Sequence, residues 1–316
     1  MSLPDAVVLF GASGFIGRNI VHALADRVPL LIGVNSSGRP VRGCTRTVAA
    51  HALEELPPLP ANSVVVHVAA FRYFASRAVE QQADIVGANL ALTDLVYRFA
   101  LQRGISELRV ASSSAVYPAE WPVLDDDRPL DLNLWPHEGE AGYAWSKRWG
   151  EIAAEIWRRR SGINTVSFRL TNPYGPFDLL DEGDAHVATA FVIRALNDGE
   201  DFEIRGDPSA ERDFVFAGDV AAAFIESMTL RGVTDAVNCA AGHTTRIDDL
   251  ARVAMQAAGR QRALRTNPPP PGGNTGVKLR RPTAARLRRL LPGLLPFRSL
   301  EDGMRETVAW YRDALR

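Results

Sequence analysis

Short apolar runs and amphipathic stretches alternate over the first 170 residues of the chain. Four runs stop at small or polar residues, as buried strands do, and they span residues 6–10, 30–34, 64–68 and 108–111. Between the last two runs, apolar residues recur at three- and four-residue steps from Ile85 to Phe99, which predicts an amphipathic helix. Gly104 is placed to end that helix. Strands that alternate with helices predict a parallel sheet with helices on both faces.

The pattern changes after residue 170, where proline and glycine interrupt the apolar runs more often. We therefore expect an α/β fold with a doubly wound parallel sheet of the Rossmann type over residues 1–170. The chain is expected to return to this sheet near residues 213–243. Residues 171–316 are expected to form a smaller C-terminal lobe.

The composition excludes several classes of protein. The 316 residues carry a formal net charge of −1, so no charge excess favours nucleic acid or an acidic membrane surface. No apolar run approaches the ~20 residues that span a bilayer, and the first residues do not resemble a signal peptide. Cys44 and Cys239 have no metal-binding spacing. We expect a cytoplasmic protein that binds no metal, no nucleic acid and no membrane.

The first apolar run is followed at once by a glycine-rich turn, Gly11-Ala-Ser-Gly-Phe-Ile-Gly17, that opens a helix running to about Asp26. The first glycine allows the tight turn, Gly14 lets the backbone approach a pyrophosphate, and the third allows close packing of helix on sheet. The helix N-terminus offers N–H groups to phosphate oxygens. This pattern predicts a dinucleotide site. Its expected contacts are Gly11, Ser13, Gly14, Phe15, Ile16 and Gly17.

The choice between NAD and NADP depends on the end of the second run. NAD-binding proteins usually have an acidic residue there, and this chain has Asn35. An asparagine can bond a ribose without repelling a 2′-phosphate, and Arg39 or Arg42 could pair with that phosphate. The same arginines can equally coat a surface loop. We expect NADP in preference to NAD as the cofactor.

Tyr143 and Lys147 are four residues apart at the start of a predicted helix over 143–160, so they share a face. A phenol, with an ordinary pKa of ~10, needs help to exchange protons near neutral pH, and a neighbouring ammonium favours the phenolate. Only two of the 36 Lys and Arg residues are lysine, Lys147 and Lys278. The alternative is a core tyrosine beside a solvated lysine. Ser112, Ser113 and Ser114 follow a predicted strand, at the sheet edge where ligands bind.

These motifs together resemble the extended short-chain dehydrogenase/reductase family, in its nucleotide-sugar epimerase/dehydratase/reductase branch. The resemblance covers nearly the whole chain. Beyond the glycine turn, the serines and the Tyr–Lys pair, it rests on His67-Val-Ala-Ala70, Asn89, Arg169-Leu-Thr-Asn-Pro-Tyr-Gly-Pro176, Arg212-Asp-Phe-Val-Phe-Ala-Gly-Asp-Val220 and Val237-Asn238.

The resemblance implies a role for each matching residue. Ser113 contacts the reacting oxygen, Tyr143 is the acid/base, and Lys147 assists it and holds the nicotinamide ribose. Ala69 and Asn89 belong to the cofactor site. Asn172 and Arg212 fall where the family binds the diphosphate of a nucleotide sugar, and residues 171–316 form its substrate-binding lobe. The resemblance also implies a homodimer that pairs through the helices near 85–103 and 143–160.

The departures from the family pattern narrow the reaction. The acidic pair of the 4,6-dehydratases is replaced by Ser114 and Ala115, so elimination of water is disfavoured. The chain resembles in part the GDP-fucose synthases, NADPH-dependent epimerase/reductases that use a cysteine and a histidine. His186 matches the histidine, whereas Ala115 occupies the cysteine position. We therefore expect reduction of a 4-keto sugar, with His186 and Ser114 as substrate contacts and 4-epimerisation by NAD as the alternative.

Two other classes of function fit the sequence less well. Some relatives bind NADP as regulators without catalysis, but those usually lack the Tyr–Lys pair. Nucleic-acid binding would use arginines whose spacing is largely that of the exposed face of a helix, and the near-neutral chain makes this the weakest option. These arginines are Arg280, Arg281, Arg286, Arg288 and Arg289.

Overall fold

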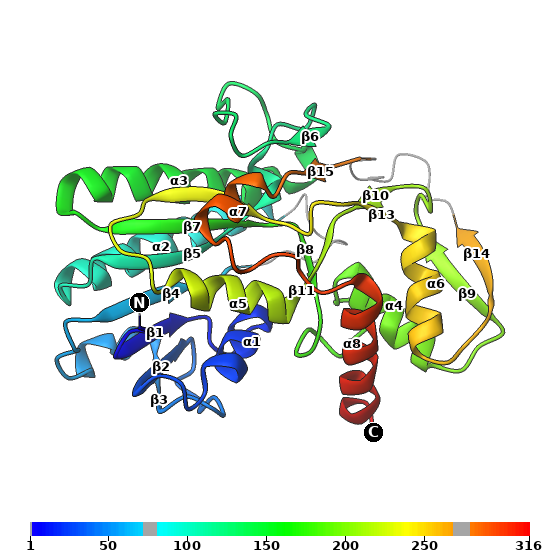
Figure 1. Ribbon diagram of the computed structural model, residues 1–316, viewed down its shortest axis with the longest axis horizontal. Coiled ribbons are helices and arrows are strands. Elements are labelled where there is room, and N and C mark those ends of the chain that lie inside the picture. Colours follow the sequence, from blue (N-terminus) through cyan, green and yellow to red (C-terminus); the bar gives the residue numbers. More distant parts are fainter. Residues whose placement is uncertain (1, 72–80, 268–278) are drawn as a thin grey trace.

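The computed structural model of the protein describes residues 2–71, 81–267 and 279–316, so Lys278 lies outside the described residues (Figure 1). Within them, a seven-stranded sheet forms the centre, and all its neighbouring strands are parallel. The order is β12-β7-β5-β4-β1-β2-β3. The strands are β1 (Ala6–Phe10), β2 (Leu30–Asn35), β3 (Arg46–Ala49), β4 (Ser63–His67), β5 (Glu107–Ser113), β7 (Asn164–Leu170) and β12 (Asp235–Cys239).

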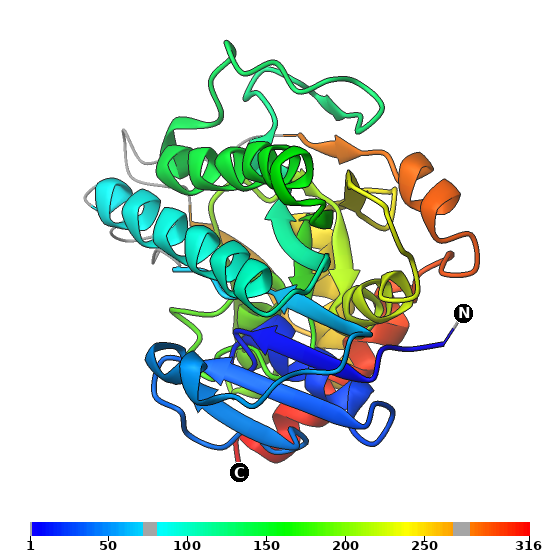
Figure 2. The ribbon, with the colours of Figure 1, turned by 90° about the vertical axis from the view of Figure 1, so that its left-hand side faces the viewer.

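Side chains of the central strands alternate between two buried layers, because successive residues of a strand point to opposite faces. In β1, Val7 and Leu9 join one apolar cluster, whereas Val8 and Phe10 join another. The first cluster is covered by α1 (Phe15–Leu24), α5 (Ala217–Ser227) and α7 (Ala285–Leu290). The second is covered by α2 (Gln82–Gln102) and α3 (Ala141–Ser161), which lie together on one side of the sheet (Figure 2). The expected doubly wound parallel sheet is confirmed.

A smaller group of elements lies beyond one end of the sheet (Figure 1). Its apolar cluster is built from α4 (Val187–Leu196), α6 (Ile247–Ala257) and α8 (Leu300–Ala314), with β9 (Asp201–Arg205) paired to β14 (Ala263–Asn267). Residues 164–170 and 235–239 nevertheless belong to the central sheet. The division of the chain into residues 1–170 and 171–316 stays a prediction.

Three short strand pairs connect the sheet with this second group. They are β8 (Asn172–Tyr174) with β11 (Phe214–Phe216), β10 (Glu211–Arg212) with β13 (Thr245–Arg246), and β6 (Val123–Leu124) with β15 (Arg281–Pro282). The first pair places Asn172 opposite Phe214, two residues after Arg212. Segments that are 33 to 158 residues apart in sequence therefore meet beyond the carboxyl end of the sheet.

The element boundaries differ from the sequence expectations at three places. The helix after the glycine turn ends at Leu24 instead of continuing to Asp26, because Ala25 already leaves the helical region with a ψ of 131° and Asp26 then adopts a positive φ of 62°. Strand β3 follows a polar loop and was not expected. Strand β5 continues to Ser113, so the serine run begins inside the sheet. The predicted helix end at Gly104 is confirmed, since α2 stops at Gln102 and Gly104 has a φ of +65°.

Candidate active site

The glycine turn lies where the ends of β1, β2 and β4 meet. The N–H of Gly11 donates to the carbonyl of Val34 at 2.9 Å, and the N–H of Ala69 donates to the carbonyl of Phe10 at 3.0 Å. Gly11 has a φ of +91°, and a Cβ on it would lie 2.6 Å from the backbone nitrogen of Ala69. Only glycine fits both the backbone angle and the space. This is the point where the strand order reverses, the usual ligand crevice of such sheets.

Helix α1 begins directly on this turn. A Cβ on Gly17 would lie 2.0 Å from the carbonyl oxygen of Gly11, so the missing side chain is what lets the helix approach. Gly14 precedes the first helical residue, and Ser13 beside it is exposed. The N–H groups of Phe15, Ile16 and Gly17 belong to the first helical turn, where backbone donors have no intrahelical acceptor. This cradle fits the pyrophosphate of a dinucleotide.

Asn35 and Asn89 both hold backbone in the places where the sequence suggested cofactor contacts. The Asn35 carbonyl oxygen accepts from the N–H of Gly38 at 2.6 Å, and its amide donates to the carbonyl of Arg39 at 2.9 Å. The side chain of Arg39, at the end of this turn, is exposed. Buried Asn89 exchanges two hydrogen bonds with the backbone of Phe71, at 2.8 and 3.1 Å, and so fixes the loop after β4 that contains Ala69.

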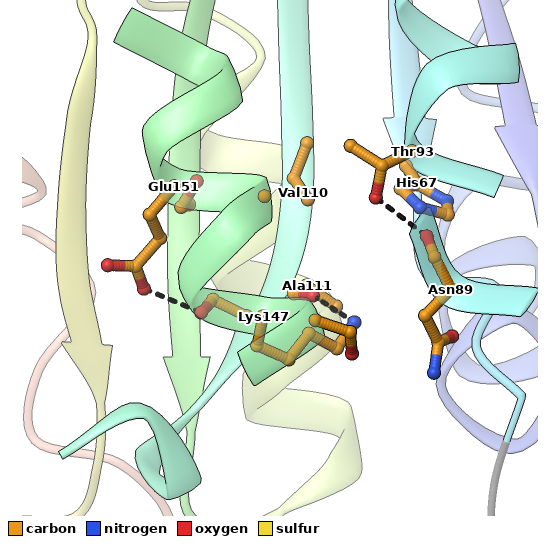
Figure 3. A pocket seen from close by; sticks show the side chains of 11 residues that line it. His67, Asn89, Thr93, Val110, Ala111, Lys147 and Glu151 are labelled. Atoms are coloured by element: carbon orange, nitrogen blue, oxygen red, sulfur yellow. Dashed lines mark hydrogen bonds between the residues drawn. The ribbon is translucent and has the colours of Figure 1, made fainter. Parts of the chain in front are cut away.

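Tyr143 and Lys147 project from α3 toward the end of β5. The Lys147 side chain is buried, its Nζ donates to the carbonyl of Ala111 at 2.7 Å, and it lies 5.5 Å from the centre of the Tyr143 ring (Figure 3). Ser113 is two residues beyond Ala111, and its hydroxyl accepts from the N–H of Ala115 at 3.1 Å. The structure thus brings the three expected catalytic residues to one junction of helix and strand.

The electrostatics of Lys147 are set by burial. Loss of solvent lowers the pKa of its ammonium to about 8, and the carboxylate of Glu151 opposes that shift. His67 lines the same small pocket, and burial together with the Lys147 charge lowers its pKa to about 3. His67 is therefore neutral at physiological pH, so it does not compete as a second cation.

The sequence analysis gave no role to Glu151. It lies one helical turn after Lys147, and it accepts from Ser112 Oγ at 2.6 Å and from Arg169 Nη2 at 2.7 Å. The four-residue spacing from Lys147 was the signal that could have found it.

A second pocket, of about 440 Å³, opens next to Ser114. Three of the four expected substrate contacts line it: Ser114, Asn172 and Arg212. The Asn172 amide donates to the carbonyl of Asp213 at 2.8 Å, which fixes its orientation at the end of β8. The full lining is Ser114, Leu124, Glu140, Thr171, Asn172, Arg212, Asp213, Arg280 and Pro282.

Arg280 is a functional candidate that sequence reasoning misplaced. It was assigned to the exposed face of a helix, but α7 begins only at Ala285, and Arg280 lines the second pocket with 13% of its side chain exposed. Its Nη1 lies 3.3 Å from Glu140, just before α3. Burial lowers the pKa of Arg212, and the charge of Arg280 lowers it further, so the two guanidinium groups act on each other. Paired cations of this kind suit a dianionic ligand.

Three of the remaining arginines of that segment are paired with acids of the same chain, among them Arg281, whose Nη2 lies 3.7 Å from Glu211. Arg286 pairs with Asp235 at 2.6 Å, and Arg289 pairs with Asp127. They hold α7 against the strand edge and the loop that follows β6. On the other side of this segment Leu287 and Leu291 are buried and Leu290 is half-buried.

His186 stands apart from the second pocket. Its Nδ1 lies 2.8 Å from a carboxylate oxygen of the buried Asp178, and its ring packs 5.7 Å from that of Phe15 at the start of α1. The structure therefore places this histidine beside the glycine turn, where the cofactor is expected, and leaves it out of the group formed by Ser114, Asn172 and Arg212.

The described residues contain no group of three or more His, Cys, Asp or Glu side chains that could hold a metal ion. No helix formed by these parts of the chain is both long and apolar enough to cross a membrane.

A Rossmann sheet with a glycine cradle and a Tyr–Lys pair defines a class, the dinucleotide-dependent oxidoreductases. The family model described as "NAD dependent epimerase/dehydratase family" matches residues 7–240. The chain belongs to that family of enzymes, which confirms the resemblance found in the sequence.

Individual relatives are similar to this chain over most of its length. A dTDP-4-dehydro-6-deoxy-D-allose reductase of Streptomyces sp is 28% identical, covering 97% of this chain and 96% of the relative. GDP-L-fucose synthase 1 of Arabidopsis thaliana is 29% identical, covering 72% and 70%. The crystal structure of UDP-glucose 4-epimerase with UDP-glucose from Thermotoga maritima superposes with a TM-score of 0.83 at 23% identity, covering 98% and 100%.

Replacement of Gly17 by alanine tests the cradle. The new Cβ would collide with the backbone of Gly11, so α1 must move away and the phosphate donors with it. We expect the Gly17→Ala protein to bind NADPH at least about tenfold more weakly in a fluorescence titration, a loss of about 1.4 kcal/mol. Gly87→Ala is the matched control, since a Cβ at Gly87 meets nothing within 4 Å. Equal affinity in both variants would contradict this account of the cradle.

Proposed function

We propose that this enzyme reduces the 4-keto group of a nucleotide-diphosphate sugar with NADPH. The observation that carries the proposal is the adjacency of two neighbouring serines. Ser113 directly follows Ala111 and Ser112, which hydrogen-bond to Lys147 and Glu151 on the helix of the Tyr–Lys pair, and Ser114 lines the pocket that contains Arg212 and Arg280. A sugar whose diphosphate occupied that pocket would have its ring beside the proton-transfer residues.

The chemistry needs one hydride and one proton. The bound cofactor supplies the hydride to the carbonyl carbon. Tyr143 donates its phenolic proton to the carbonyl oxygen, and Ser113 holds that oxygen by a hydrogen bond as it becomes an alcohol. Lys147 stabilises the phenolate that remains on Tyr143, because its ammonium lies against the ring. The same ammonium is placed to hold the nicotinamide ribose.

The diphosphate would be bound by Arg212, Arg280 and the amide of Asn172. A guanidinium fork meets two phosphate oxygens at once, and two forks match the charge of a diphosphate. Free of ligand, Arg280 is held by Glu140, so binding would exchange that carboxylate for phosphate. Most residues of the pocket come from 171–316, which supports the assignment of that region as the substrate-binding lobe.

Three segments of the chain would form the cofactor site: the glycine turn, the turn after β2 and the loop after β4. Gly11, Ser13, Gly14, Phe15, Ile16 and Gly17 would hold the pyrophosphate. Asn35 shapes the turn that carries Arg39, and Ala69 is fixed by the loop that Asn89 supports. Arg39 is exposed, and position 35 has an asparagine where NAD-binding proteins usually have an acidic residue. Both features favour NADP over NAD.

The choice of a reductase over a 4-epimerase rests on two further observations. Two relatives that match at least 96% of both chains are named 4-dehydro-sugar reductases, at 28% and 27% identity, whereas a GDP-mannose 3,5-epimerase that covers 98% of this chain and 82% of the relative is 24% identical. Asp178 holds His186 beside Phe15, where its ring could contact a sugar bound next to the cofactor. The 4-epimerase is the second candidate, because the superposed Thermotoga maritima enzyme is one.

The pairing of two copies is also proposed. The outer face of α3 exposes Trp149 and Ile156, seven residues apart and so on one stripe, with 43% and 49% of their surface accessible. The neighbouring α2 exposes Leu101 and the small residues Gly87 and Ala91. Two antiparallel copies of this helix pair would bury the stripe.

A direct assay tests the reaction. With a nucleotide-linked 4-keto-6-deoxy sugar, we expect one NADPH to be oxidised per sugar reduced, followed by absorbance at the nicotinamide band. Tyr143→Phe should bind NADPH as the wild type does and lose turnover by about 10² to 10⁴-fold. Interconversion of sugar epimers without net NADPH oxidation would contradict the reductase and favour the epimerase.

A second comparison tests the diphosphate pocket. Arg212→Ala and Arg280→Ala should each raise KM for the sugar nucleotide by about tenfold or more, with a smaller effect on kcat, because each removes a charge-assisted contact. Arg281→Ala is the matched control, since 58% of the Arg281 side chain is exposed. Equal KM values in the three variants would show that the diphosphate binds elsewhere.

The dimer is tested by Trp149→Arg. Sedimentation velocity of the wild type should give twice the monomer mass, and the substitution should shift the population toward monomers, because it places a charge in the apolar stripe. Leu180→Arg is the control, with 47% of Leu180 exposed in the segment between β8 and α4. A wild type that sediments as a monomer would end the proposal.

A further inference from the structure

Glu151 lies on α3 two helical turns after Tyr143 and one turn after Lys147. Residues at i, i+4 and i+8 share one face of a helix, so the carboxylate continues the row formed by the phenol and the ammonium. Lys147 and Glu151 both line the small pocket beneath the site, and Figure 3 shows their side chains leaving the same helix near Ala111. The carboxylate is largely buried, with 11% of the side chain exposed.

Two hydrogen bonds join this face of α3 to the last residues of β5. Lys147 donates to the carbonyl of Ala111 at 2.7 Å, and Ser112 donates to Glu151 Oε1 at 2.6 Å. The next residue of the strand is Ser113. Two consecutive strand residues, Ala111 and Ser112, are each hydrogen-bonded to the helix. These two bonds fix the position of the following Ser113, along the strand direction, relative to Tyr143.

A third element enters through Arg169 on β7. Its guanidinium meets Glu151 with two hydrogen bonds, Nε to Oε1 at 2.9 Å and Nη2 to Oε2 at 2.7 Å. Arg169 is the register partner of Ser112 across the β5–β7 pair. One carboxylate therefore holds the helix against two adjacent strands at their carboxyl ends. Buried bidentate pairs of this kind have well-defined geometry.

The charged and titratable groups around Lys147 come from three elements. His67 comes from β4 and is neutral, and Tyr143 and Glu151 come from α3. Arg169 comes from β7 and carries the positive charge that pairs with Glu151. Burial depresses the pKa of Lys147 to about 8, and Glu151 is the group that counteracts this. Loss of its charge would leave two cations facing each other in a buried site.

We propose that Glu151 is a positioning residue for proton transfer, holding Lys147 charged and Tyr143 in register with Ser113. The inference rests on the proposed reductase function, since it assigns the proton to Tyr143. The carboxylate touches neither substrate nor cofactor. It acts through Lys147, Ser112 and Arg169.

The test uses the small number of lysines in the chain. Protein labelled with lysine carrying ¹³C at Cε gives two signals, from Lys147 and Lys278, and the Lys278→Arg variant assigns them. We expect Glu151→Gln to lower the pKa of Lys147 by about one pH unit in an NMR titration. Charged Lys147 is the active form, so activity is lost as pH rises through its pKa. The alkaline limb of kcat should therefore move to lower pH by the same amount.

The kinetic readout separates positioning from folding. Glu151→Gln should lower kcat at neutral pH by about tenfold and leave KM for the sugar nearly unchanged, because Arg212 and Arg280 are untouched. Ser112→Ala keeps the pair with Arg169 and should lower kcat with little change in the pKa of Lys147. Glu155→Gln is the matched control, since Glu155 pairs with Arg158 and Arg159 on the outer surface.

The outcomes are distinct. A Glu151→Gln protein that loses thermal stability but keeps the wild-type pKa of Lys147 and the wild-type kcat overturns the inference. If that variant does not fold, Ser112→Ala decides, and an unchanged kcat in it overturns the role in register. A wild type that does not reduce 4-keto sugars refutes the proposed function; the NMR titration of Lys147 then still decides whether Glu151 sets its charge.

Discussion

A charged amine buried at the end of a β-strand is the constraint on which this site depends. An ammonium taken out of water is costly unless other groups replace its solvation. Here the carbonyl of Ala111 and the carboxylate of Glu151 form that replacement, and the neighbouring His67 is neutral and adds no repelling charge. Each comes from a different part of the fold, so α3, β4 and β5 must keep their relative positions for Lys147 to remain charged.

The same polar layer extends to the substrate side. Arg169 donates from Nη1 to the hydroxyl of Tyr117 at 2.8 Å, and Tyr117 donates to Asn238 at 2.8 Å. The amide of Asn238 then donates to the carbonyls of Leu124 and Thr283, at 2.8 and 3.1 Å. Leu124 lines the second pocket, and Thr283 follows Pro282, which also lines it. A continuous chain of hydrogen bonds therefore joins the helix of the proton-transfer pair to the wall of the substrate pocket.

The sequence predicted the parts of the fold that local patterns specify. The four apolar runs and the helix from Ile85 were found because burial on one or both faces leaves a clear periodicity. The glycine turn was found because its spacing follows from backbone geometry. The end of α1 was placed too late, since the positive φ of Asp26 has no apolar signature.

The site was predictable only where its residues are close in sequence. Tyr143 and Lys147 share one helix face, which the spacing alone reveals. Arg280 was misplaced because its position depends on a contact with Glu140, 140 residues earlier. Asn35 and Asn89 stay predicted cofactor contacts, and the structure adds that their amides hold backbone, a role that no sequence pattern distinguishes from cofactor binding.

The two pockets are built from different stretches of the chain, and this has a consequence for how such an enzyme diversifies. The proposed cradle for the dinucleotide uses residues 11–17 and 69, whereas the second pocket, the proposed substrate site, takes most of its lining from 171–172, 212–213, 280 and 282. Substitutions in the later stretches would alter which sugar is accepted without disturbing the redox step. Lineages derived from one ancestor can therefore exchange substrates while inheriting their hydride chemistry unchanged.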